Sequence, residues 1–371
     1  MMRRILLALA LLAAPAAAEE PPVVSERATF RVVTFAAGLE HPWGAAFLPD
    51  GSLLVTERPG RLRRITPDGR VSAPLAGVPQ VEAAGQGGLL DIALAPDFAR
   101  SREVFLCHAA AVPGGVLTRL VTARLSPAND ALTGVRRLLD ATPPQASGRL
   151  HFGCRIVFGG DGHLYLSTGE RNERARAQRL DDLAGKILRL TRDGRPPADN
   201  PFVGRDGARP EIWSLGHRNP QGLALNPWTG SLWEAEFGPR GGDEINIIRR
   251  GANYGWPLVS HGREYWGPRI SREVSAPGLE DPVHVFSPPV SPSGIAFYDG
   301  AAFPGWRGSL FVAALNTPGL VRLSTEGDRV TGEERLLTGR WRIRHVVVGP
   351  DGRPYLLTDE AEGRILRLDP A

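Results

Sequence analysis

Residues 148–170 read GRLHFGCRIVFGGDGHLYLSTGE, and the second half of this stretch repeats in weaker form along the chain. There, two β-rich runs flank the turn GGDG, and the carboxylate of Glu170 follows the second run. Alternating apolar and polar residues are typical of strands, and glycine with aspartate supplies the backbone geometry of a hairpin. The first half, which holds His151 among glycines, has no counterpart in the repeats. We therefore expect the repeats to build a scaffold and His151 to take part in its chemistry.

The repeated unit occurs six times, at intervals of roughly 45 to 80 residues, which is at and above the usual period of propeller blades. Each copy starts at a turn rich in Gly, Asp or Pro, and 33 prolines and 44 glycines argue against long helices. The pattern predicts an all-β fold, a six-bladed β-propeller with four-stranded antiparallel blades. Two β-sandwich domains are the alternative, although no linker separates two halves. The six turns lie at residues 49–51, 96–98, 160–162, 226–227, 305–308 and 350–352.

The spacing between the units is uneven, and the additional residues fall near 110–150, 171–210 and 251–300. Long connections in a compact β fold often carry function. We therefore expect a functional site to involve these three segments.

The N-terminus, MMRRILLALALLAAPAAA at residues 1–18, has a basic start, an apolar centre and small residues before Glu19. These features predict a secretory signal peptide, because the apolar run is too short for a transmembrane anchor. No later stretch is long and apolar enough to span a bilayer. We expect a soluble, exported, periplasmic protein in which residues 19–28 form a leader and residues 29–371 form one propeller domain.

The chain contains two cysteines, Cys107 and Cys154. An oxidising compartment would allow them to form a disulfide. The sequence leaves the pairing open, because it does not show whether their Cα atoms are close enough.

The chain of 371 residues carries a formal charge of +4, and 42 % of its residues are apolar, which is enough for a large core. Lys186 is its only lysine, so arginine supplies almost all of the positive charge. The arginines are scattered and often lie near Asp or Glu, whereas a nucleic-acid surface usually clusters Lys and Arg with aromatic residues. The pattern argues against nucleic acid as a partner and leaves some arginines for an anionic ligand.

His151 lies just before a predicted strand, and a propeller gathers such loops around its central axis. Histidine has a pKa near neutrality, so a positioned imidazole can accept a proton at working pH. Glu170 follows the second strand of the same unit, where it is placed to orient the imidazole. The alternatives are a structural or merely exposed histidine and a solvated loop acid.

Two further pairs suit a ligand rich in carboxylate or carbonyl oxygens. Arg218 and Asn219 lie side by side in GHRNPQGL at residues 216–223. Arg342 and Arg344 are two residues apart, so both side chains lie on one face of a strand. Two guanidinium groups aimed one way suit a polycarboxylate. The alternatives are a loop stabilised by Asn-Pro turn chemistry and a solvated strand face.

The segment EFGPRGGDEINIIRRGANYGWP at residues 236–257 offers hard oxygen ligands in a short, glycine-rich turn. Carbonyl and carboxylate oxygens at this density suit Ca²⁺. The ligand spacing of an EF-hand is absent, so an acidic turn without a metal is the alternative. The oxygen donors come from Gly238, Pro239, Asp243, Glu244 and Asn246.

Five motifs follow one another along the chain: GQGGLLDIALAPDF (85–98), GRLHFGCRIVF (148–158), GHRNPQGL (216–223), EFGPRGGDEINIIRRGANYGWP (236–257) and RWRIRHVVVGPDGRPYLLTD (340–359). In this succession they closely resemble the soluble aldose and glucose dehydrogenases that depend on pyrroloquinoline quinone (PQQ). The resemblance runs from about residue 30 to the C-terminus, and the order of the motifs makes it far more specific than any one of them.

The resemblance implies a six-bladed propeller that holds PQQ at its axial mouth above a Ca²⁺ ion and oxidises the anomeric C1 of an aldose to a lactone. It identifies His151 as the catalytic base, with Glu170 behind it. The remaining positions that it implies fall into three groups. Those around the cofactor are Gln86, Arg218, Asn219, Tyr265, Asn316, Arg342 and Arg344. The carbonyls of Gly238 and Pro239 would hold the calcium of the cofactor, and Glu244 and Tyr254, with Asp243, would form a second calcium site.

Two positions depart from the family pattern. The family usually has Asp where this chain has Glu170, which keeps the charge but adds a methylene group. It also has a lysine where this chain has Asn316, and an amide supplies no positive charge there. Two other functions therefore stay open, a non-catalytic propeller that binds a sugar or a protein and a metal-dependent lactonase.

The resemblance implies an aldose as substrate. We also expect an external electron acceptor, because the chain has neither the C-x-x-C-H motif of haem attachment nor a flavin fingerprint. The preferred sugar, the physiological acceptor and the choice between monomer and homodimer are left open by the sequence.

Overall fold

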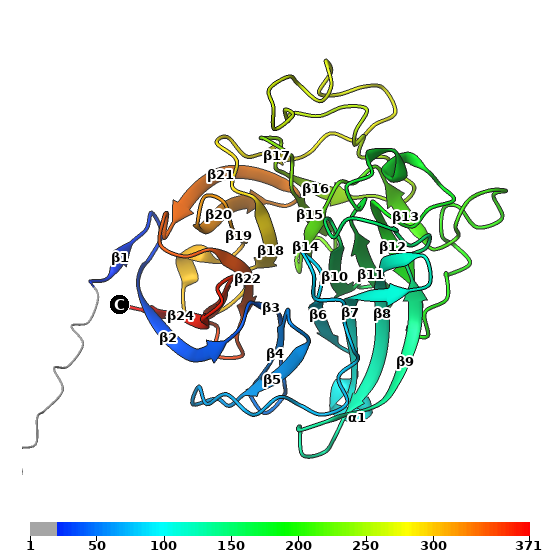
Figure 1. Cartoon of the computed structure of the whole chain (residues 1–371). Coiled ribbons are helices and arrows are strands. Elements are labelled where there is room, and N and C mark those ends of the chain that lie inside the picture. Colours follow the sequence, from blue (N-terminus) through cyan, green and yellow to red (C-terminus); the bar gives the residue numbers. More distant parts are fainter. Residues whose placement is uncertain (1–20) are drawn as a thin grey trace, which may run out of the picture.

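The computed structural model describes residues 21–371. The predicted signal peptide, residues 1–18, lies outside the described residues, as do the first two residues of the predicted leader. Within the described part, six antiparallel sheets are arranged around a central axis (Figure 1), which confirms the predicted six-bladed β-propeller. Helix is confined to one short α-helix and two 3₁₀ turns in these residues: α1 (Phe98–Ser101), η1 (Arg174–Gln178) and η2 (Pro304–Trp306).

The first three blades follow one another in chain order. Blade 1 has three strands, β3 (Pro42–Phe47), β4 (Leu53–Glu57) and β5 (Arg61–Ile65). Blade 2 has four, β6 (Leu89–Leu94), β7 (Glu103–Val112), β8 (Gly115–Leu125) and β9 (Leu132–Asp140). Blade 3 contains the stretch that starts at Gly148 and comprises β10 (Gly153–Phe158), β11 (Leu164–Thr168), β12 (Lys186–Leu190) and β13 (Ile212–Leu215).

The remaining blades complete the ring. Blade 4 comprises β14 (Pro220–Leu225), β15 (Leu232–Glu236), β16 (Glu244–Ile248) and β17 (His284–Val285). Blade 5 comprises β18 (Pro292–Phe297), β19 (Leu310–Ala314), β20 (Gly319–Glu326) and β21 (Arg329–Leu336). Blade 6 has five strands, β22 (Ile343–Val348), β23 (Pro354–Thr358), β24 (Gly363–Pro370), β2 (Thr29–Leu39) and β1 (Val23–Val24).

The ring is closed by the two ends of the chain. Strand β2 pairs antiparallel with β24, from Phe30 opposite Pro370 to Leu39 opposite Gly363. Blade 6 therefore contains strands from both termini, which removes an open sheet edge at the point where the ring would otherwise end. Part of the predicted leader belongs to the propeller, because its residues Val23 and Val24 form β1 on the outer edge of this blade.

The core lies between neighbouring blades, so the middle of each sheet is covered on both faces. In five blades the second strand, β4, β11, β15, β19 or β23, is buried at every residue. Its apolar residues fill the space between the sheets, while its polar residues need partners inside the protein. The Ser167 hydroxyl, for example, donates to the Pro220 carbonyl of the next blade over 2.8 Å.

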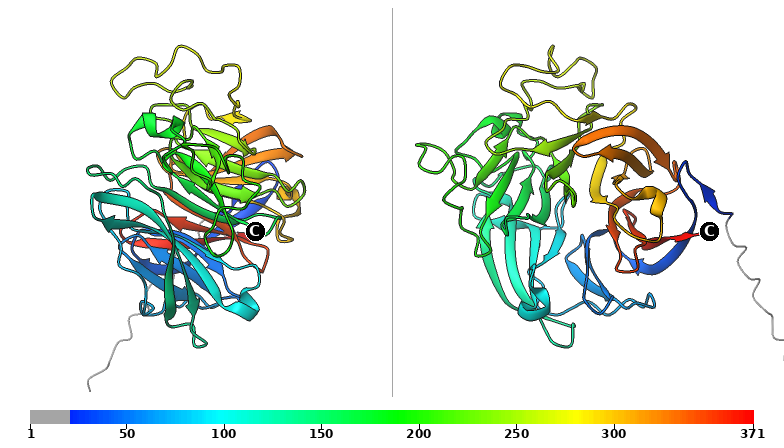
Figure 2. Two further views of the ribbon diagram at one scale, coloured as in Figure 1. Left: turned by 90° about the vertical axis from the view of Figure 1, so that its right-hand side faces the viewer. Right: turned by 180° about the vertical axis from the view of Figure 1, so that it is seen from behind.

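In two of the three segments of uneven spacing, the additional residues serve different purposes. Residues 110–150 mainly lengthen strands, because β7, β8 and β9 contain 10, 11 and 9 residues. The expectation that this segment forms a long functional connection is therefore wrong for most of it. Residues 249–283 do form a long connection between β16 and β17, and it projects beyond the sheets in all three views of Figures 1 and 2.

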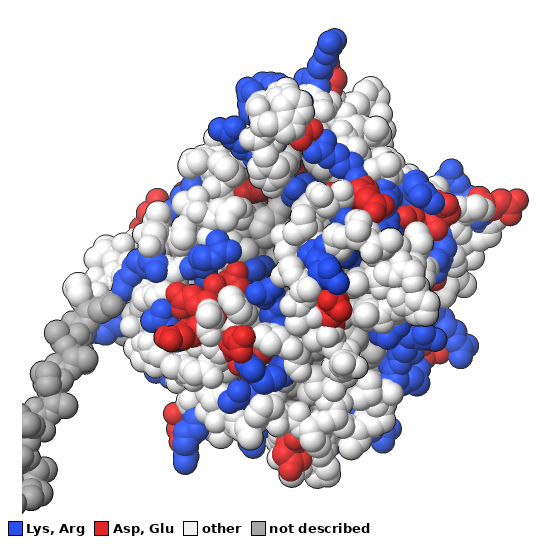
Figure 3. Space-filling view, in the orientation of Figure 1, with Lys and Arg blue, Asp and Glu red and all other residues white. Residues whose placement is uncertain are grey.

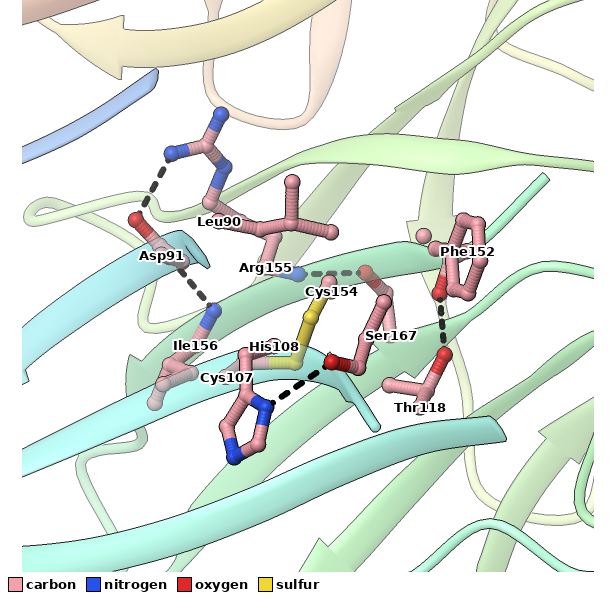
Figure 4. Close-up of a disulfide and its surroundings, with 12 residues drawn as sticks. Leu90, Asp91, Cys107, His108, Thr118, Phe152, Cys154, Arg155, Ile156 and Ser167 are labelled. Carbon is pink, nitrogen blue, oxygen red and sulfur yellow. Dashed lines mark hydrogen bonds and ion pairs between the residues drawn. A yellow bond between two sulfur atoms is a disulfide. The ribbon is translucent and has the colours of Figure 1, made fainter. Parts of the chain in front are cut away.

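Cys107 in β7 and Cys154 in β10 form a disulfide, with their Cα atoms 5.6 Å apart (Figure 4). The bond joins blades 2 and 3 within the core and settles the pairing that the sequence left open. A hydrogen bond also joins the two blades near the disulfide, because the Thr118 hydroxyl of β8 donates to the Phe152 carbonyl over 2.9 Å. Blade 2 thus holds the start of β10, directly after His151.

We expect the Cys107→Ala/Cys154→Ala variant to lose about 3–4 kcal/mol of unfolding free energy, because the bond closes a loop across 47 residues and restricts the unfolded chain. Denaturant titration under non-reducing conditions measures this difference. Dithiothreitol should destabilise the wild type and leave the variant unchanged. Equal stabilities of the two oxidised proteins would contradict the prediction.

Among residues 21–371, no helix has the length and the apolar character needed to cross a bilayer. In the orientation of Figure 1, basic and acidic side chains are interspersed over the visible face (Figure 3).

Candidate active site

A cavity of about 400 Å³ opens on the axis of the propeller. The inner strands of the six blades, β3, β6, β10, β14, β18 and β22, all begin at this end, so the loops before them converge here. Ten of the predicted residues line it: Gln86, His151, Arg218, Asn219, Gly238, Pro239, Tyr265, Asn316, Arg342 and Arg344. The structure therefore brings together motifs from blades 2 to 6.

His151 is held on the wall of this cavity by contacts on both sides. Its backbone N–H donates to Gln86 Oε1 over 2.8 Å, and its Nδ1 lies 3.0 Å from Glu170 Oε1. The backbone at His151 is left-handed, with φ of 50°, which turns the imidazole out of the strand direction. Gly169 permits the close approach of the two loops, because a Cβ there would lie 2.2 Å from the His151 carbonyl oxygen.

Glu170 fixes the tautomer of His151. A carboxylate oxygen only accepts hydrogen bonds, so Nδ1 carries the proton and Nε2 keeps its lone pair. Glu170 itself is fixed, because its second oxygen accepts the Glu173 backbone N–H over 3.0 Å. Its own backbone N–H donates to the Arg218 carbonyl over 2.9 Å. The longer side chain of glutamate is thus accommodated with its contact to the imidazole in place.

Burial lowers the pKa of His151 below the ordinary value of 6.5. The hydrogen bond to Glu170 acts in the opposite direction, and the positive charges of Arg218 and Arg171 lower the pKa further. The imidazole is therefore neutral near pH 7, which is the state in which Nε2 accepts a proton.

Trp43 and Arg344 line the cavity, and a second buried arginine, Arg155, lies outside the lining. Arg344 donates to Gln221 Oε1 over 2.6 Å and to Asp359 Oδ2 over 2.8 Å. The guanidinium of Arg155 lies 4.2 Å from the ring centroid of Trp43. Burial alone would raise the pKa of Asp359, but Arg344 and Arg342 outweigh it and hold the pKa well below its usual range.

The lining carries an excess of positive charge. Four arginines face one carboxylate, Asp359, which is already paired with two of them. Such a set favours a polyanionic ligand, since each guanidinium can hold a carboxylate by two parallel hydrogen bonds. The arginines are Arg58, Arg218, Arg342 and Arg344.

Asn316 is one of the lining residues, and Arg342 lies directly on it. Arg342 Nη1 donates to the Asn316 Oδ1 over 3.3 Å and to the Leu315 carbonyl over 3.0 Å. A positive charge is therefore present beside the position where the family has lysine. Lys186 is elsewhere, buried in blade 3, where its ammonium group donates to three backbone carbonyls.

The turn with Gly238 and Pro239 forms another part of the wall. Arg218 Nη1 donates to the carbonyls of Phe237 and Gly238 over 3.0 and 3.1 Å. Asp243 shapes this turn, because its two carboxylate oxygens accept three backbone N–H groups, one of them from Gly238. The turn thus lines the cavity on a backbone that a buried carboxylate holds in place.

A second, much smaller cavity of about 20 Å³ lies in blade 4 and is lined by Glu236, Glu244 and Tyr254. Burial and the nearby Glu236 raise the pKa of Glu244 to about 8. The paired strands β15 and β16 also bring Glu234 opposite Asn246 on the same face. Glu234 Oε1 and Asn246 Oδ1 are buried and have no partner among the described residues. Buried oxygens that repel one another favour a bound cation.

Several lining residues were not predicted from the sequence: His41, Trp43, Arg58, Gln221, Ser291 and Asp359. Most of them lie just before or at the start of an inner strand, the same place in the repeat as His151. Their position within the repeated unit could therefore have identified them, because equivalent positions of a propeller meet at the axis.

Comparison with known proteins agrees with this geometry. Residues 39–367 match the sequence profile of the Glucose / Sorbosone dehydrogenase family. The chain is 47 % identical over 349 residues to Aldose sugar dehydrogenase YliI of Escherichia coli (strain K12), and the match covers 92 % of this chain and 94 % of that protein.

Solved structures give the same relationship. The apo-form of the soluble aldose sugar dehydrogenase from Escherichia coli superposes with a TM-score of 0.90 at 46 % identity, covering 92 % of this chain and 100 % of that one. The PQQ-bound form of aldose sugar dehydrogenase from Streptomyces coelicolor gives a TM-score of 0.78 at 34 % identity, covering 92 % and 98 %. The resemblance drawn from the five motifs is thus confirmed. The chain belongs to the Glucose / Sorbosone dehydrogenase family of oxidoreductases.

Proposed function

We propose that this protein is an exported sugar dehydrogenase that depends on PQQ and Ca²⁺ and oxidises the anomeric C1 of aldoses to lactones. The observation that carries the proposal is the His151–Glu170 pair on the wall of an arginine-lined axial cavity. The names of its relatives support the same substrate class. The PQQ-bound relative supports the cofactor.

The residues present fit the cofactor. PQQ carries three carboxylates, and the cavity offers Arg58, Arg218, Arg342 and Arg344 with a single, already paired carboxylate. Gln86, Asn219, Asn316 and Tyr265 supply further polar contacts around it. The carbonyls of Gly238 and Pro239 would hold Ca²⁺, a hard cation that prefers oxygen ligands. When bound, PQQ and Ca²⁺ together would supply a hydride acceptor, because the metal would polarise a carbonyl group of the quinone.

The chain itself supplies the base. His151 Nε2 would take the proton of the C1 hydroxyl as the hydride leaves C1. Glu170 keeps Nδ1 protonated before this step and stabilises the imidazolium formed by it. Gln86 holds the backbone of His151, so the imidazole keeps its place while its charge changes.

A second calcium ion would occupy the small cavity of blade 4. Glu244 and Tyr254 line that cavity, and Asp243 orders the neighbouring turn. A bound cation would lower the pKa of Glu244 and compensate for the repulsion from Glu236. This ion would act on stability rather than on the reacting atoms.

Export and an external electron acceptor complete the proposal. The disulfide between Cys107 and Cys154 favours an oxidising compartment, in agreement with the predicted signal peptide and a periplasmic location. A separate acceptor would take up the electrons removed from the sugar. The protein would act as a monomer or homodimer.

Absorbance titration of the apoprotein with PQQ in the presence of Ca²⁺, followed by an aldose, tests the proposal. We expect saturable binding of the quinone, then bleaching of its oxidised spectrum on addition of several aldoses, and no binding after chelation of Ca²⁺. Binding without any bleaching by aldoses would contradict the dehydrogenase. Failure to bind in the presence of Ca²⁺ would contradict the cofactor.

Asn316 is the observation that favours a second candidate, a propeller that binds a sugar or protein without redox function. Failure to bind PQQ in the titration would support it, but Arg342 beside Asn316 makes a charge available there. A metal-dependent lactonase needs carboxylates converging on the axis. In residues 21–371, the lining of the axial cavity offers Asp359 alone, and two arginines occupy it.

A further inference from the structure

An ion pair joins two loops, one of which carries Tyr265, a lining residue of the axial cavity. Arg174 belongs to η1, in the connection that follows Glu170, and Glu264 belongs to the long connection of blade 4. Arg174 Nη1 and Nη2 donate to the two carboxylate oxygens of Glu264 over 2.6 and 2.7 Å. This bidentate geometry fixes orientation as well as distance. We call the pair the Arg174–Glu264 clamp.

The loop that the clamp holds, residues 258–275, has little burial of its own to fix it. It projects from blade 4 at the top of Figure 1, and Tyr265 and Trp266 are 69 % and 79 % exposed. Its backbone closes on itself, since the Glu264 N–H donates to the Pro268 carbonyl over 2.7 Å. Its position over the cavity therefore depends on particular contacts with the body of the protein.

Two of these contacts are made by the two residues immediately before Tyr265, Arg263 and Glu264. The backbone groups of Arg263 exchange hydrogen bonds of 3.2 Å with those of Arg240, directly after Pro239. The clamp then acts at Glu264, the residue before Tyr265. Tyr265 lines the axial cavity, so fixing Glu264 fixes the approach of this aromatic ring to the cavity.

The clamp is also linked to a lining residue of the axial cavity, Arg218, through the ring of Trp256. The guanidinium of Arg174 lies 5.5 Å from the ring centroid of this buried tryptophan. The guanidinium of Arg218, a lining residue, lies 5.4 Å from the same centroid. Arg174 therefore contacts both the loop that carries Tyr265 and the ring of Trp256 beside Arg218. It does so from the connection that follows Glu170.

We propose that Arg174 and Glu264 are positioning residues that hold Tyr265 at the mouth of the cofactor cavity and so set the affinity for what binds there. The effect on cofactor and sugar rests on the proposed function, whereas the effect on the loop does not. A neighbouring pair provides a matched control. Arg179 and Asp181 form the same bidentate contact, over 3.0 and 2.8 Å, but both belong to one connection and join no second loop.

The test compares wild type with Glu264→Ala, the charge swap Arg174→Glu/Glu264→Arg, and the control Arg179→Ala. Hydrogen exchange of peptides covering residues 258–275 is measured on the apoprotein. We expect roughly threefold to tenfold faster exchange in Glu264→Ala, as loss of a partly exposed bidentate pair implies, and recovery in the swap. The control should exchange like wild type.

Steady-state kinetics and PQQ titration of the same variants give the second readout. Glu264→Ala should raise the KM for an aldose or the Kd for PQQ by roughly threefold to tenfold, while kcat stays within about twofold, because the base is untouched. The swap should restore the lower value. Unchanged exchange in Glu264→Ala, or an effect as large in Arg179→Ala, would overturn the clamp. If wild type fails to bind PQQ, the proposed function falls, and the exchange data still decide the clamp.

Discussion

Replacement of His151 by alanine is expected to lower kcat for aldose-dependent dye reduction by about 10²- to 10⁴-fold, the usual contribution of a positioned general base. The imidazole is held between Gln86 and Glu170 with Nε2 available. Among residues 21–371, the other histidine of the lining is His41, whose Nδ1 lies 3.3 Å from Asp359 Oδ1. That carboxylate is shared with Arg342 and Arg344, whereas Glu170 pairs with no arginine side chain among the same residues. Dye reduction by the PQQ- and Ca²⁺-loaded protein measures the effect.

Two controls separate lost chemistry from lost structure. The His151→Ala variant should bind PQQ like wild type in the absorbance titration and unfold at the same denaturant concentration within error. His163→Ala changes a histidine of the same blade that pairs with Asp161 at the turn between β10 and β11, and it should keep the wild-type kcat. Activity of His151→Ala near the wild-type level would contradict the assigned base.

Replacement of Glu170 by glutamine is expected to lower kcat by about 10²- to 10⁴-fold as well, although the base itself remains. An amide can donate to Nδ1 as well as accept from it, so the imidazole loses the group that keeps the proton on Nδ1. The carboxylate charge that stabilises the imidazolium is also lost. Glu170→Asp keeps both properties and matches the usual residue of the family, so it should recover most of the activity.

The pH profile distinguishes this role from a structural one. In the proposed mechanism His151 acts in its neutral form, so we expect activity to be lost as the pH falls through its pKa in the folded protein, which burial lowers below 6.5. The bond to Glu170 raises this pKa, so Glu170→Gln should lower it and move the acid limb of kcat/KM to lower pH. An acid limb that stays in place in the variant would show that Glu170 does not act on the charge of the imidazole.

Much of the candidate site could be predicted because the sequence repeats. Equivalent positions of a propeller repeat meet at the axis, so residues placed just before successive inner strands, such as His151 and Asn219, are neighbours whatever their separation in sequence. The same rule covers Trp43 and Ser291, which carry no distinctive chemistry and were missed for that reason. Asp359 and Glu170 both lie after their strands, outside this rule, and Glu170 was predicted because it follows His151 in the same unit.

What lies outside the repeat could not be predicted in this way. The loop with Tyr265 and Glu264 has no counterpart in other blades, so its contact with Arg174 follows from no periodicity. The role of Asp243 also depends on a distant segment, because two of its three donors come from Val290 and Ser291. A carboxylate in a glycine-rich turn looks the same in sequence whether it binds a metal or a set of backbone N–H groups.

The sequence by itself determined the six blades, because strand alternation and turn chemistry are local properties that repeat. It also pointed to His151, Glu170 and three of the four arginines that line the cavity, Arg218, Arg342 and Arg344. Tertiary structure alone decided how the ring closes, through β2 beside β24, since pairing of the two chain ends is not a local property. It also decided that Cys107 and Cys154 pair, because the packing of blade 2 on blade 3 sets their separation. The stretch from Gly148 to Glu170 shows both: its pattern marks a blade, and the neighbouring blade fixes where His151 points.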